Sequence, residues 1–246
     1  MMLIIPAAGR GSRMAGEAGS PPKCLLTVGG STLLSRLVSD LTSGITQVRI
    51  VVPPGNPHLA AWRESQPDPA ALQLVEAPVE PYGHTILRAI DGAAYAVVVD
   101  SDLVTAPGEL ADFLRHAISN PSRTSLTVGV SRDPWSLGPR TIWWSSGRIG
   151  RDLSQASARM AGVYCLRERV LARLRDFVNT GGTSFAAFLS AHPADDVDAV
   201  EFRYAFDLNT PADLDAARRR VGDASRADTQ TGTVDAIERP EAAPLR

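Results

Sequence analysis

The stretch from Leu3 to Met14 constrains the fold of this chain most. Its short run of leucine and isoleucine predicts a buried strand, and Pro6 with glycines at positions 9 and 11 ends that strand in a loop. Glycine has no Cβ, so backbone N–H groups of such a loop can approach an anion closely. The loop therefore predicts a cradle for a triphosphate. The residues expected to bind the nucleotide there are Ala7, Ala8, Gly9, Arg10, Gly11 and Ser12.

Lys23 is the only lysine among the 25 basic residues of the chain. A compact ammonium on a flexible stem can follow one phosphate oxygen through a reaction, which a planar guanidinium does less well. We therefore expect Lys23, together with Arg13 of the loop, to act on the phosphates as a catalytic residue. The alternative is that Lys23 is an ordinary surface charge.

Two other phosphate-binding motifs do not fit this loop. A Walker P-loop requires Gly-Lys-Ser/Thr after the glycines, whereas this chain has Gly11-Ser12-Arg13. A dinucleotide-binding fingerprint requires a third glycine at position 14, which is Met14.

The run Pro6-Ala7-Ala8-Gly9-Arg10-Gly11-Ser12-Arg13-Met14, followed by Pro22-Lys23-Cys24-Leu25-Leu26, resembles the signature of the sugar-nucleotidyltransferase-like superfamily. The resemblance covers about residues 1–221 and is strongest at 3–26 and 203–214. It implies a GT-A-like nucleotidyltransferase fold. It also implies that an NTP is joined to a phosphate-bearing acceptor and that pyrophosphate is released.

Apolar strands and amphipathic helices alternate along the first hundred residues. Strands are expected at 48–52, 72–75 and 96–99, and helices at 33–41, 58–64 and 84–94. This alternation predicts an α/β fold with a doubly wound, mostly parallel, Rossmann-like mixed sheet and helices on both faces. Ligands of such sheets bind at the carboxyl ends of the strands, where the glycine loop lies.

The second half of the chain is less regular. It predicts helices at 107–119, 168–178, 184–191 and 211–221, strands at 125–130, 160–166 and 200–206, and a hairpin at 141–149. Apolar periodicity vanishes after residue 221. We therefore expect a nucleotidyltransferase domain over 1–221 and a disordered carboxyl-terminal tail over 222–246.

Asp100 and Asp102 end the apolar strand at 96–99. Two carboxylates there are costly unless water or a hard cation such as Mg²⁺ neutralises them, and a pair of turn aspartates is the alternative. The resemblance implies a magnesium ligand at this strand end, with Asp102 favoured and Asp100 left open. It implies a second ligand at Asp207, which precedes Asn209-Thr210-Pro211-Ala212-Asp213. Because both acids end strands of one sheet, we expect Asp102 and Asp207 to converge on one ion.

The residues after Asp207 have a structural explanation. Thr210 can cap the following helix, Pro211 suits its first turn, and Asp213 suits its amino end. We expect no chemical role for these three.

The contacts to base and acceptor are less well defined by the sequence. The resemblance places the nucleobase at Gly83 and Thr85, which can equally be the start of a helix. It also places Gly162 beside the acceptor. Other candidates to hold an anionic acceptor are Arg140, Arg151 and Arg159.

Composition excludes several classes of partner. A net charge of −2 indicates neither a nucleic-acid footprint nor a polybasic membrane patch. No apolar run approaches the ~18 residues of a transmembrane helix, and the amino terminus does not resemble a secretory signal. Cys24 and Cys165 lack paired metal spacing, which favours reduced thiols and a cytoplasmic protein. A homodimer is left open.

Together these features predict a Mg²⁺-dependent nucleotidyltransferase. The preferred reaction transfers CMP from CTP to a small phosphate- or phosphonate-bearing acceptor. One alternative is a sugar-1-phosphate nucleotidyltransferase that uses another NTP. A GT-A type glycosyltransferase would share the Asp-x-Asp sequence, but it would not need the glycine loop and Pro22-Lys23. A noncatalytic nucleotide-binding module is the third alternative.

Overall fold

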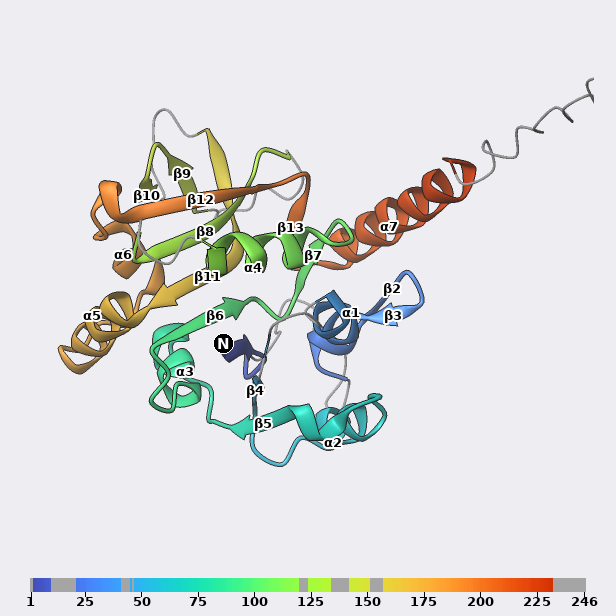
Figure 1. Cartoon of the computed structure of the whole chain (residues 1–246). Coiled ribbons are helices and arrows are strands. Elements are labelled where there is room, and N and C mark those ends of the chain that lie inside the picture. Colours follow the sequence, from blue (N-terminus) through green and yellow to red (C-terminus); the bar gives the residue numbers. More distant parts are fainter. Residues whose placement is uncertain are drawn as a thin grey trace, which may run out of the picture.

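The computed structural model describes residues 2–9, 21–40, 45, 47–119, 124–133, 142–150 and 157–231, with only the backbone at 40 and 223–231 (Figure 1). Its central element is strand β1 (Met2–Pro6). β1 lies between two parallel neighbours, β4 (Gln47–Val52) and β6 (Tyr95–Val99). β5 (Leu72–Glu76) extends the parallel part beyond β4. The carboxyl ends of these four strands therefore share one edge of the sheet.

The sheet becomes mixed beyond β6. The long strand β11 (Ala158–Arg167) pairs antiparallel with β6 on one side and with β8 (Leu126–Ser131) on the other. β12 (Val197–Phe202) then runs parallel to β8, and the hairpin β9 (Trp143–Ser145) and β10 (Arg148–Gly150) attaches to the start of β11. The predicted doubly wound, mixed sheet is confirmed.

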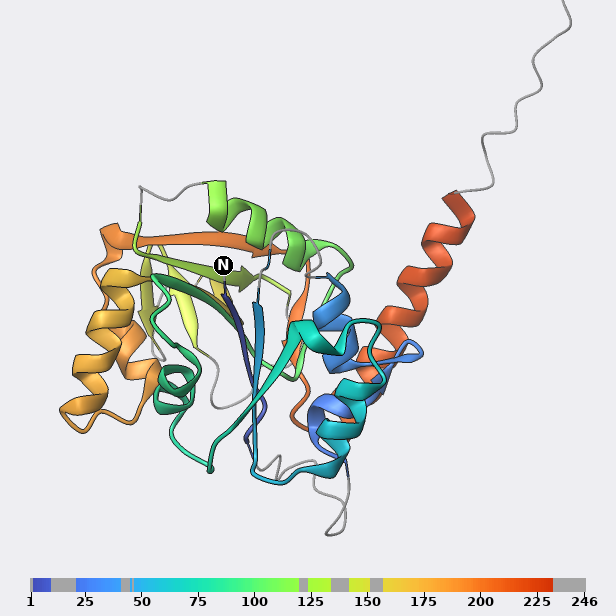
Figure 2. The same cartoon turned by 60° about the horizontal axis from the view of Figure 1, so that its bottom comes forward.

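Helices cover both faces of this sheet (Figure 2). One face packs against α1 (Leu33–Asp40), α2 (Pro57–Glu64) and α4 (Glu109–Ser119), and the other against α3 (Tyr82–Ala89), α5 (Glu168–Asn179) and α6 (Phe185–Ser190). Alternate residues explain how one strand serves both layers. Leu3 and Ile5 of β1 face the first layer, whereas Met2 and Ile4 face the second.

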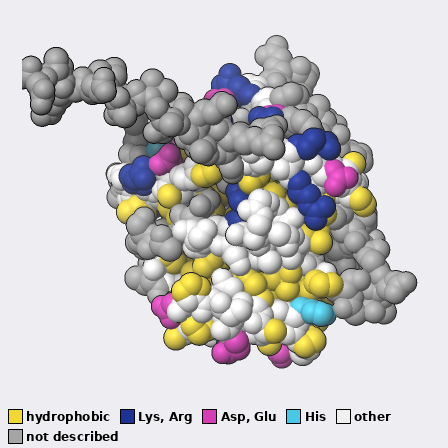
Figure 3. All heavy atoms as spheres, turned by 90° about the vertical axis from the view of Figure 1, so that its right-hand side faces the viewer, with side chains coloured by type: hydrophobic (Ala, Val, Ile, Leu, Met, Phe, Trp, Pro, Cys, Tyr) yellow, Lys and Arg dark blue, Asp and Glu magenta, His cyan; other side chains and the backbone are white. Residues whose placement is uncertain are grey.

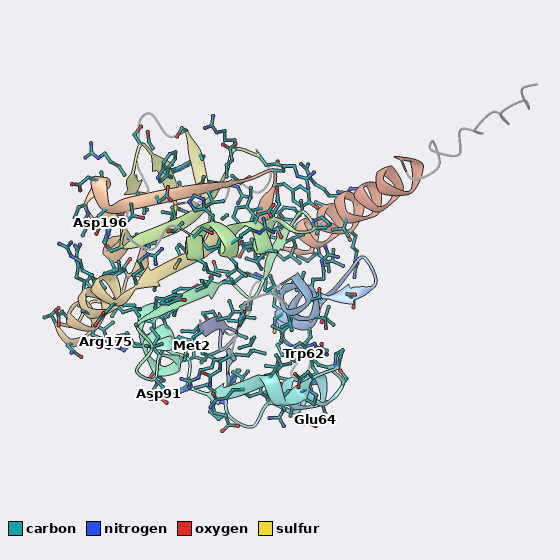
Figure 4. All side chains as sticks on the ribbon, in the orientation of Figure 1. Met2, Trp62, Glu64, Asp91, Arg175 and Asp196 are labelled. Carbon is teal, nitrogen blue, oxygen red and sulfur yellow. The ribbon has the colours of Figure 1, made fainter. Side chains whose placement is uncertain are left out.

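Trp62 illustrates how the helices of the first layer are joined. It lies on α2 beside α1 (Figure 4), where its indole N–H donates to the Oγ of Ser35 at 2.9 Å. The ring itself is buried in the core of that layer. Short 3₁₀ turns complete the connections, namely η1 (Lys23–Leu25), η2 (Pro69–Ala71) and η3 (Ala194–Asp196).

Two small antiparallel pairs lie outside the main sheet. They are β2 (Thr27–Val28) with β3 (Ser31–Thr32), and β7 (Leu103–Thr105) with β13 (Ala205–Asp207). Helix α7 (Pro211–Thr231) packs on both pairs through a third apolar cluster, which includes Val28, Val104, Phe206 and Val221. The far end of α7 projects away from the sheet (Figure 1).

Three boundaries differ from the sequence prediction. The strand expected at 200–206 is two strands, because the chain leaves β12 after Phe202 and begins β13 at Ala205. The helix expected at 84–94 ends at Ala89. The last helix continues to Thr231 rather than ending at 221, so the first part of the expected tail is helical. The division into a domain and a tail stays a prediction, and residues 232–246 lie outside the described part.

Candidate active site

Three carboxylates meet where β6, β7 and β13 come together. Asp100 follows β6, Asp102 precedes β7, and Asp207 is the last residue of β13. The antiparallel pairing sets Asp207 opposite Leu103, and the N–H of Leu208 donates to the carbonyl of Asp102 at 3.1 Å. One carboxylate oxygen from each aspartate lies within 4.8 Å of the other two. Asp102 and Asp207 thus lie together, as the strand-end argument led us to expect.

Without a cation, it is unfavourable for the three carboxylates of this acid cluster (Asp100, Asp102 and Asp207) to be ionised together. Burial, followed by the charge of Asp102, raises the pKa of Asp207 to about 7. Burial, followed by Asp207 and Asp102, raises the pKa of Asp100 well above its usual range. Three oxygen donors that repel one another, with no nitrogen or sulfur ligand among them, are the donor set that a hard divalent cation prefers.

Lys23 is the cation that the chain itself supplies to this cluster. It begins the 3₁₀ turn η1 and forms an ion pair with Asp102. Its Nζ also lies 3.5 Å from the Oδ1 of Asn209. The side chains of Lys23 and Asp102 keep 16% and 22% of their surface exposed, so a substrate can reach both. The single lysine of the sequence therefore lies in the acid cluster and is not an isolated surface charge.

Asp100 is held from two sides. The hydroxyl of Tyr82, the first residue of α3, donates a hydrogen bond to its Oδ1. On the other side lies Gly162 of β11, whose carbonyl accepts the N–H of Asp100 at 2.9 Å. Burial, then Asp100, raises the pKa of Tyr82 well above its usual range, so the phenol remains a donor. Sequence reasoning missed Tyr82, although it directly precedes the Gly83 that was singled out.

The structure gives Gly83 and Thr85 a packing role. Gly83 is buried, and a Cβ there would meet Leu174 of α5 at 3.3 Å. Thr85 is 4% exposed, and its Oγ1 lies 3.5 Å from the carbonyl of Pro81. Gly83 thus packs against α5 and Thr85 against the turn that begins α3, as the helix-start alternative requires, while their contact with the nucleobase stays a prediction.

The glycine loop starts at the same edge of the sheet as the acid cluster. Ala7 and Ala8 are buried, and the N–H of Ala7 donates to the carbonyl of Val51 at 2.8 Å. Gly9 is exposed, and a Cβ there would meet nothing within 4 Å. The remaining loop residues, Arg10, Gly11, Ser12 and Arg13, lie outside the described residues, as do the acceptor candidates Arg140 and Arg151.

The third acceptor candidate, Arg159, lies on β11 and is 4% exposed. Burial lowers the pKa of its guanidinium, while Asp207 and then Asp133 oppose that shift. Arg159 thus interacts electrostatically with the acid cluster. Gly162 lies directly against the carboxylate of Asp100 and is therefore next to the acid cluster.

The capping prediction for the last helix is confirmed. The N–H of Asp213 donates to Thr210 Oγ1 at 3.2 Å, and the N–H of Thr210 donates to Asp213 Oδ2 at 2.7 Å. This reciprocal pair fixes the start of α7 directly after Asn209. The cap thereby positions Asn209 beside Lys23.

Comparison with known proteins agrees with this fold. The family model of the MobA-like NTP transferase domain matches residues 3–194. The inositol-1-phosphate CTP transferase from T. maritima has a similar fold, with a TM-score of 0.70 at 18% identity over 91% of this chain and 96% of that chain. The UTP-bound UGPase from Acinetobacter baumannii gives 0.73 at 16% identity, over 95% and 99%. No curated protein matches the sequence.

The doubly wound fold and the family match define a nucleotidyltransferase. The chain belongs to the MobA-like NTP transferase family. The family match ends before β13, so Asp207 lies beyond the matched region. The pairing of β13 with β7 brings it beside Asp102. Within the described residues, no helix is long and apolar enough to cross a membrane.

Proposed function

We propose that this protein transfers a nucleoside monophosphate from an NTP to a small phosphate- or phosphonate-bearing acceptor and releases pyrophosphate. The observation that carries the proposal is the acid cluster with Lys23, at the edge where the glycine loop leaves β1. β1 and β6 are adjacent and parallel, so the loop after Pro6 and the acids after Val99 lie at the same edge. A triphosphate in the loop would therefore have its phosphates near Lys23 and the acids.

The acid cluster fits a magnesium ion. Its oxygens are close enough to share one cation, which would offset the burial and the repulsion from Asp102 that raise the pKa of Asp207. Asp102 and Asp207 are the proposed ligands, and Asp100 is a third candidate. When bound, Mg²⁺ would offset the charge of the triphosphate and of the leaving pyrophosphate.

The chain's own residues would contribute positioning and charge. A phosphate or phosphonate acceptor is already ionised at neutral pH, so the reaction needs no general base at its nucleophile. Loop amides and Arg13 would hold the β- and γ-phosphates, and Lys23 the α-phosphate or the acceptor oxygen. Such preorganised charge lowers the barrier because it neutralises the transition state without rearranging.

The choice of CTP and of acceptor is the finer part of the proposal. One structural neighbour is described as an inositol-1-phosphate CTP transferase and another as a UTP-bound UGPase. The first supports both CTP and a phosphate-bearing acceptor, whereas the second leaves UTP as the alternative. Figure 3 shows several basic side chains in the upper half of one face, with acidic side chains among them. A homodimer and a cytoplasmic location stay predictions.

The test is release of pyrophosphate from each of the four NTPs, with Mg²⁺ and a panel of phospho- and phosphono-compounds. We expect acceptor-dependent release with one NTP, and a loss of that release in Asp102→Asn. Asp112→Asn is the matched control, because Asp112 is an exposed aspartate of α4 that pairs with Arg115. Release of a nucleoside diphosphate from a nucleotide sugar would favour a glycosyltransferase. Nucleotide binding without turnover on any acceptor would favour a binding module.

A further inference from the structure

Arg159 is a buried arginine whose guanidinium Nε and Nη2 have no hydrogen-bond partner among the described residues. It lies on β11 opposite Ser131 of β8 and Trp143 of β9. Its Nε and Nη2 are buried, and neither donates to any residue of the part of the chain that the structure describes. A buried charged group that lacks hydrogen bonds is costly, so native proteins retain one mainly where a partner arrives later.

Arg49 shows how this fold treats a structural arginine. It is also buried, at 8% exposure, but its Nε donates to Gln73 at 2.9 Å and its Nη1 to the carbonyl of Ala89 at 2.6 Å. Arg49 thus ties β4 to β5 and to the end of α3. Within the described residues, Nε and Nη2 of Arg159 make no comparable bond, so the described contacts give Arg159 no structural role of this kind.

The carboxylates that act on Arg159 are already committed elsewhere. Asp133 accepts a hydrogen bond from Arg220 of α7, and Asp207 belongs to the acid cluster. Both attract the guanidinium electrostatically, but among the described residues neither accepts a hydrogen bond from its Nε or Nη2. The guanidinium of Arg159 can therefore still accept an anionic partner, at a position beside Asp207.

The strand order tells which anion this is. Along the sheet the order is β11, β6, β1, so the acids after β6 lie between the glycine loop after β1 and Arg159 on β11. A triphosphate in the glycine loop would therefore approach the acids from one side, and an anion on Arg159 from the other. Two anions on opposite sides of one cation site correspond to the two substrates of a transfer reaction.

We infer that Arg159 binds the phosphate or phosphonate group of the acceptor and sets it beside the acid cluster. This inference rests on the proposed function for the identity of the two substrates. A planar guanidinium can bind two oxygens of such a group and leave the third free. That oxygen forms a bond to the α-phosphorus, while the bond from the α-phosphorus to the bridging oxygen breaks and pyrophosphate leaves with its electron pair. An uncharged hydroxyl acceptor would leave the buried charge unpaired and would be rejected.

The experiment compares Arg159→Met with the matched control Arg49→Met. Methylphosphonate is the probe, titrated by ³¹P NMR against protein that holds Mg²⁺ and an α,β-methylene nucleotide, so that the nucleotide site is already filled. We expect Arg159→Met to weaken probe binding by about 30-fold or more, because one partner of a charged pair is lost. Arg49→Met should leave probe binding unchanged. Arg159→Lys, which keeps the charge but not the fork, should fall between wild type and Arg159→Met.

Melting temperature without ligands supplies the second readout. Arg159→Met should melt no lower than wild type, because methionine removes a buried charge and breaks no hydrogen bond. Arg49→Met should melt clearly lower, because it leaves the carbonyl of Ala89 without its donor. A fall in Arg159→Met as large as that in Arg49→Met would assign Arg159 a structural role and overturn the inference.

Three further outcomes separate this inference from the proposed function. If Arg159→Met weakens the binding of the nucleotide or of pyrophosphate but not that of methylphosphonate, the guanidinium binds the triphosphate and the inference is wrong. If pyrophosphate release fails for every NTP while methylphosphonate binding still depends on Arg159, the proposed reaction is wrong and the anion site stands. If Arg159→Met turns over with an unchanged KM for the acceptor, the proposed reaction is supported and the anion site at Arg159 is wrong.

Discussion

A Cβ on Gly162 would lie 2.5 Å from the Oδ2 of Asp100, so glycine at this position makes room for that carboxylate. Its backbone also has a φ of +70°, a conformation that residues other than glycine rarely adopt. Tyr82 bonds the other oxygen of the same carboxylate. Asp100 is therefore held between α3 and β11, and its orientation depends on both.

Tyr82→Phe should weaken metal binding and leave the fold intact. The ring stays packed against Phe185, with centroids 5.0 Å apart, while Asp100 loses the bond that orients it. Loss of such an outer partner typically costs about 10- to 100-fold in metal affinity. The measurement is Mn²⁺ affinity by electron paramagnetic resonance, together with the Mg²⁺ dependence of turnover.

Tyr204→Phe is the control for this prediction. Its hydroxyl is also buried but has no hydrogen-bond partner within the described residues, and its ring stacks under Arg220 away from the acids. Equal metal affinity in wild type and Tyr82→Phe would mean that Asp100 needs no support from α3.

Lys23→Arg should impair turnover although the charge is kept. The broader guanidinium must fit between Asp102 and Asn209, where the ammonium now lies. Loss of one charged contact in the transition state costs about 10²–10³ in rate, and Lys23→Ala should reach the upper end. Arg115→Lys, an exchange on the exposed face of α4, should be neutral. Wild-type kcat in Lys23→Arg would show that any cation serves at this position.

The contribution of Asp207 to the stability of the metal-free protein should fall as the pH rises from about 4 to about 7. Asp207 has a pKa of about 7 in the folded state against an ordinary value of 3.8, so the folded state binds more protons than the unfolded state within this window. Stability from this group is full below pH 3.8 and is lost as the pH passes 7. Asp207→Asn removes the effect, so its stability advantage over wild type should grow across the window and then level off.

Chemical denaturation at several pH values, with EDTA and then with Mg²⁺, measures this difference. Saturating Mg²⁺ should reduce the advantage of Asp207→Asn, because the cation favours the ionised carboxylate. An advantage that does not change with pH would mean that Asp207 is ionised throughout and that its pKa is not raised.

A chain that ends at Gly222 should match the full-length protein in melting temperature and turnover. Val221 is the last residue of α7 with a described apolar contact, and it packs so closely that a Cβ on Gly29 would meet it at 2.5 Å. Removing Val221 as well, in a chain that ends at Arg220, should lower the melting temperature. A clear loss on ending at Gly222 would show that the residues beyond it dock on the domain or on a partner.

Most of the fold could be predicted from the sequence because its cause is local. The alternation of apolar strands with amphipathic helices is sufficient to predict a doubly wound sheet. Thr210 and Asp213 mark the start of α7, where they cap the helix. The strand expected at 200–206 could not be divided, because nothing in the composition shows that the chain leaves β8 at the end of β12 and joins β7 as β13.

The site was predicted in part, for the same reason. Strand-end aspartates and a solitary lysine can be read from the sequence, since their chemistry is unusual where it stands. The hydrogen bond from Tyr82 to Asp100 joins segments that only the tertiary fold brings together. Arg159 carried no signal stronger than Arg140 or Arg151, because burial and a missing partner are properties of the folded state.

The pairing of β13 with β7 also has a consequence for the order in which the protein is made. Asp100 and Asp102 leave the ribosome in the first half of synthesis, whereas Asp207 follows almost the whole main sheet. The amino-terminal βαβ units are therefore synthesised while the acid cluster still lacks a member. Under the proposed function, catalytic competence arrives with the last strand, so a chain released before β13 would be partly folded and inactive.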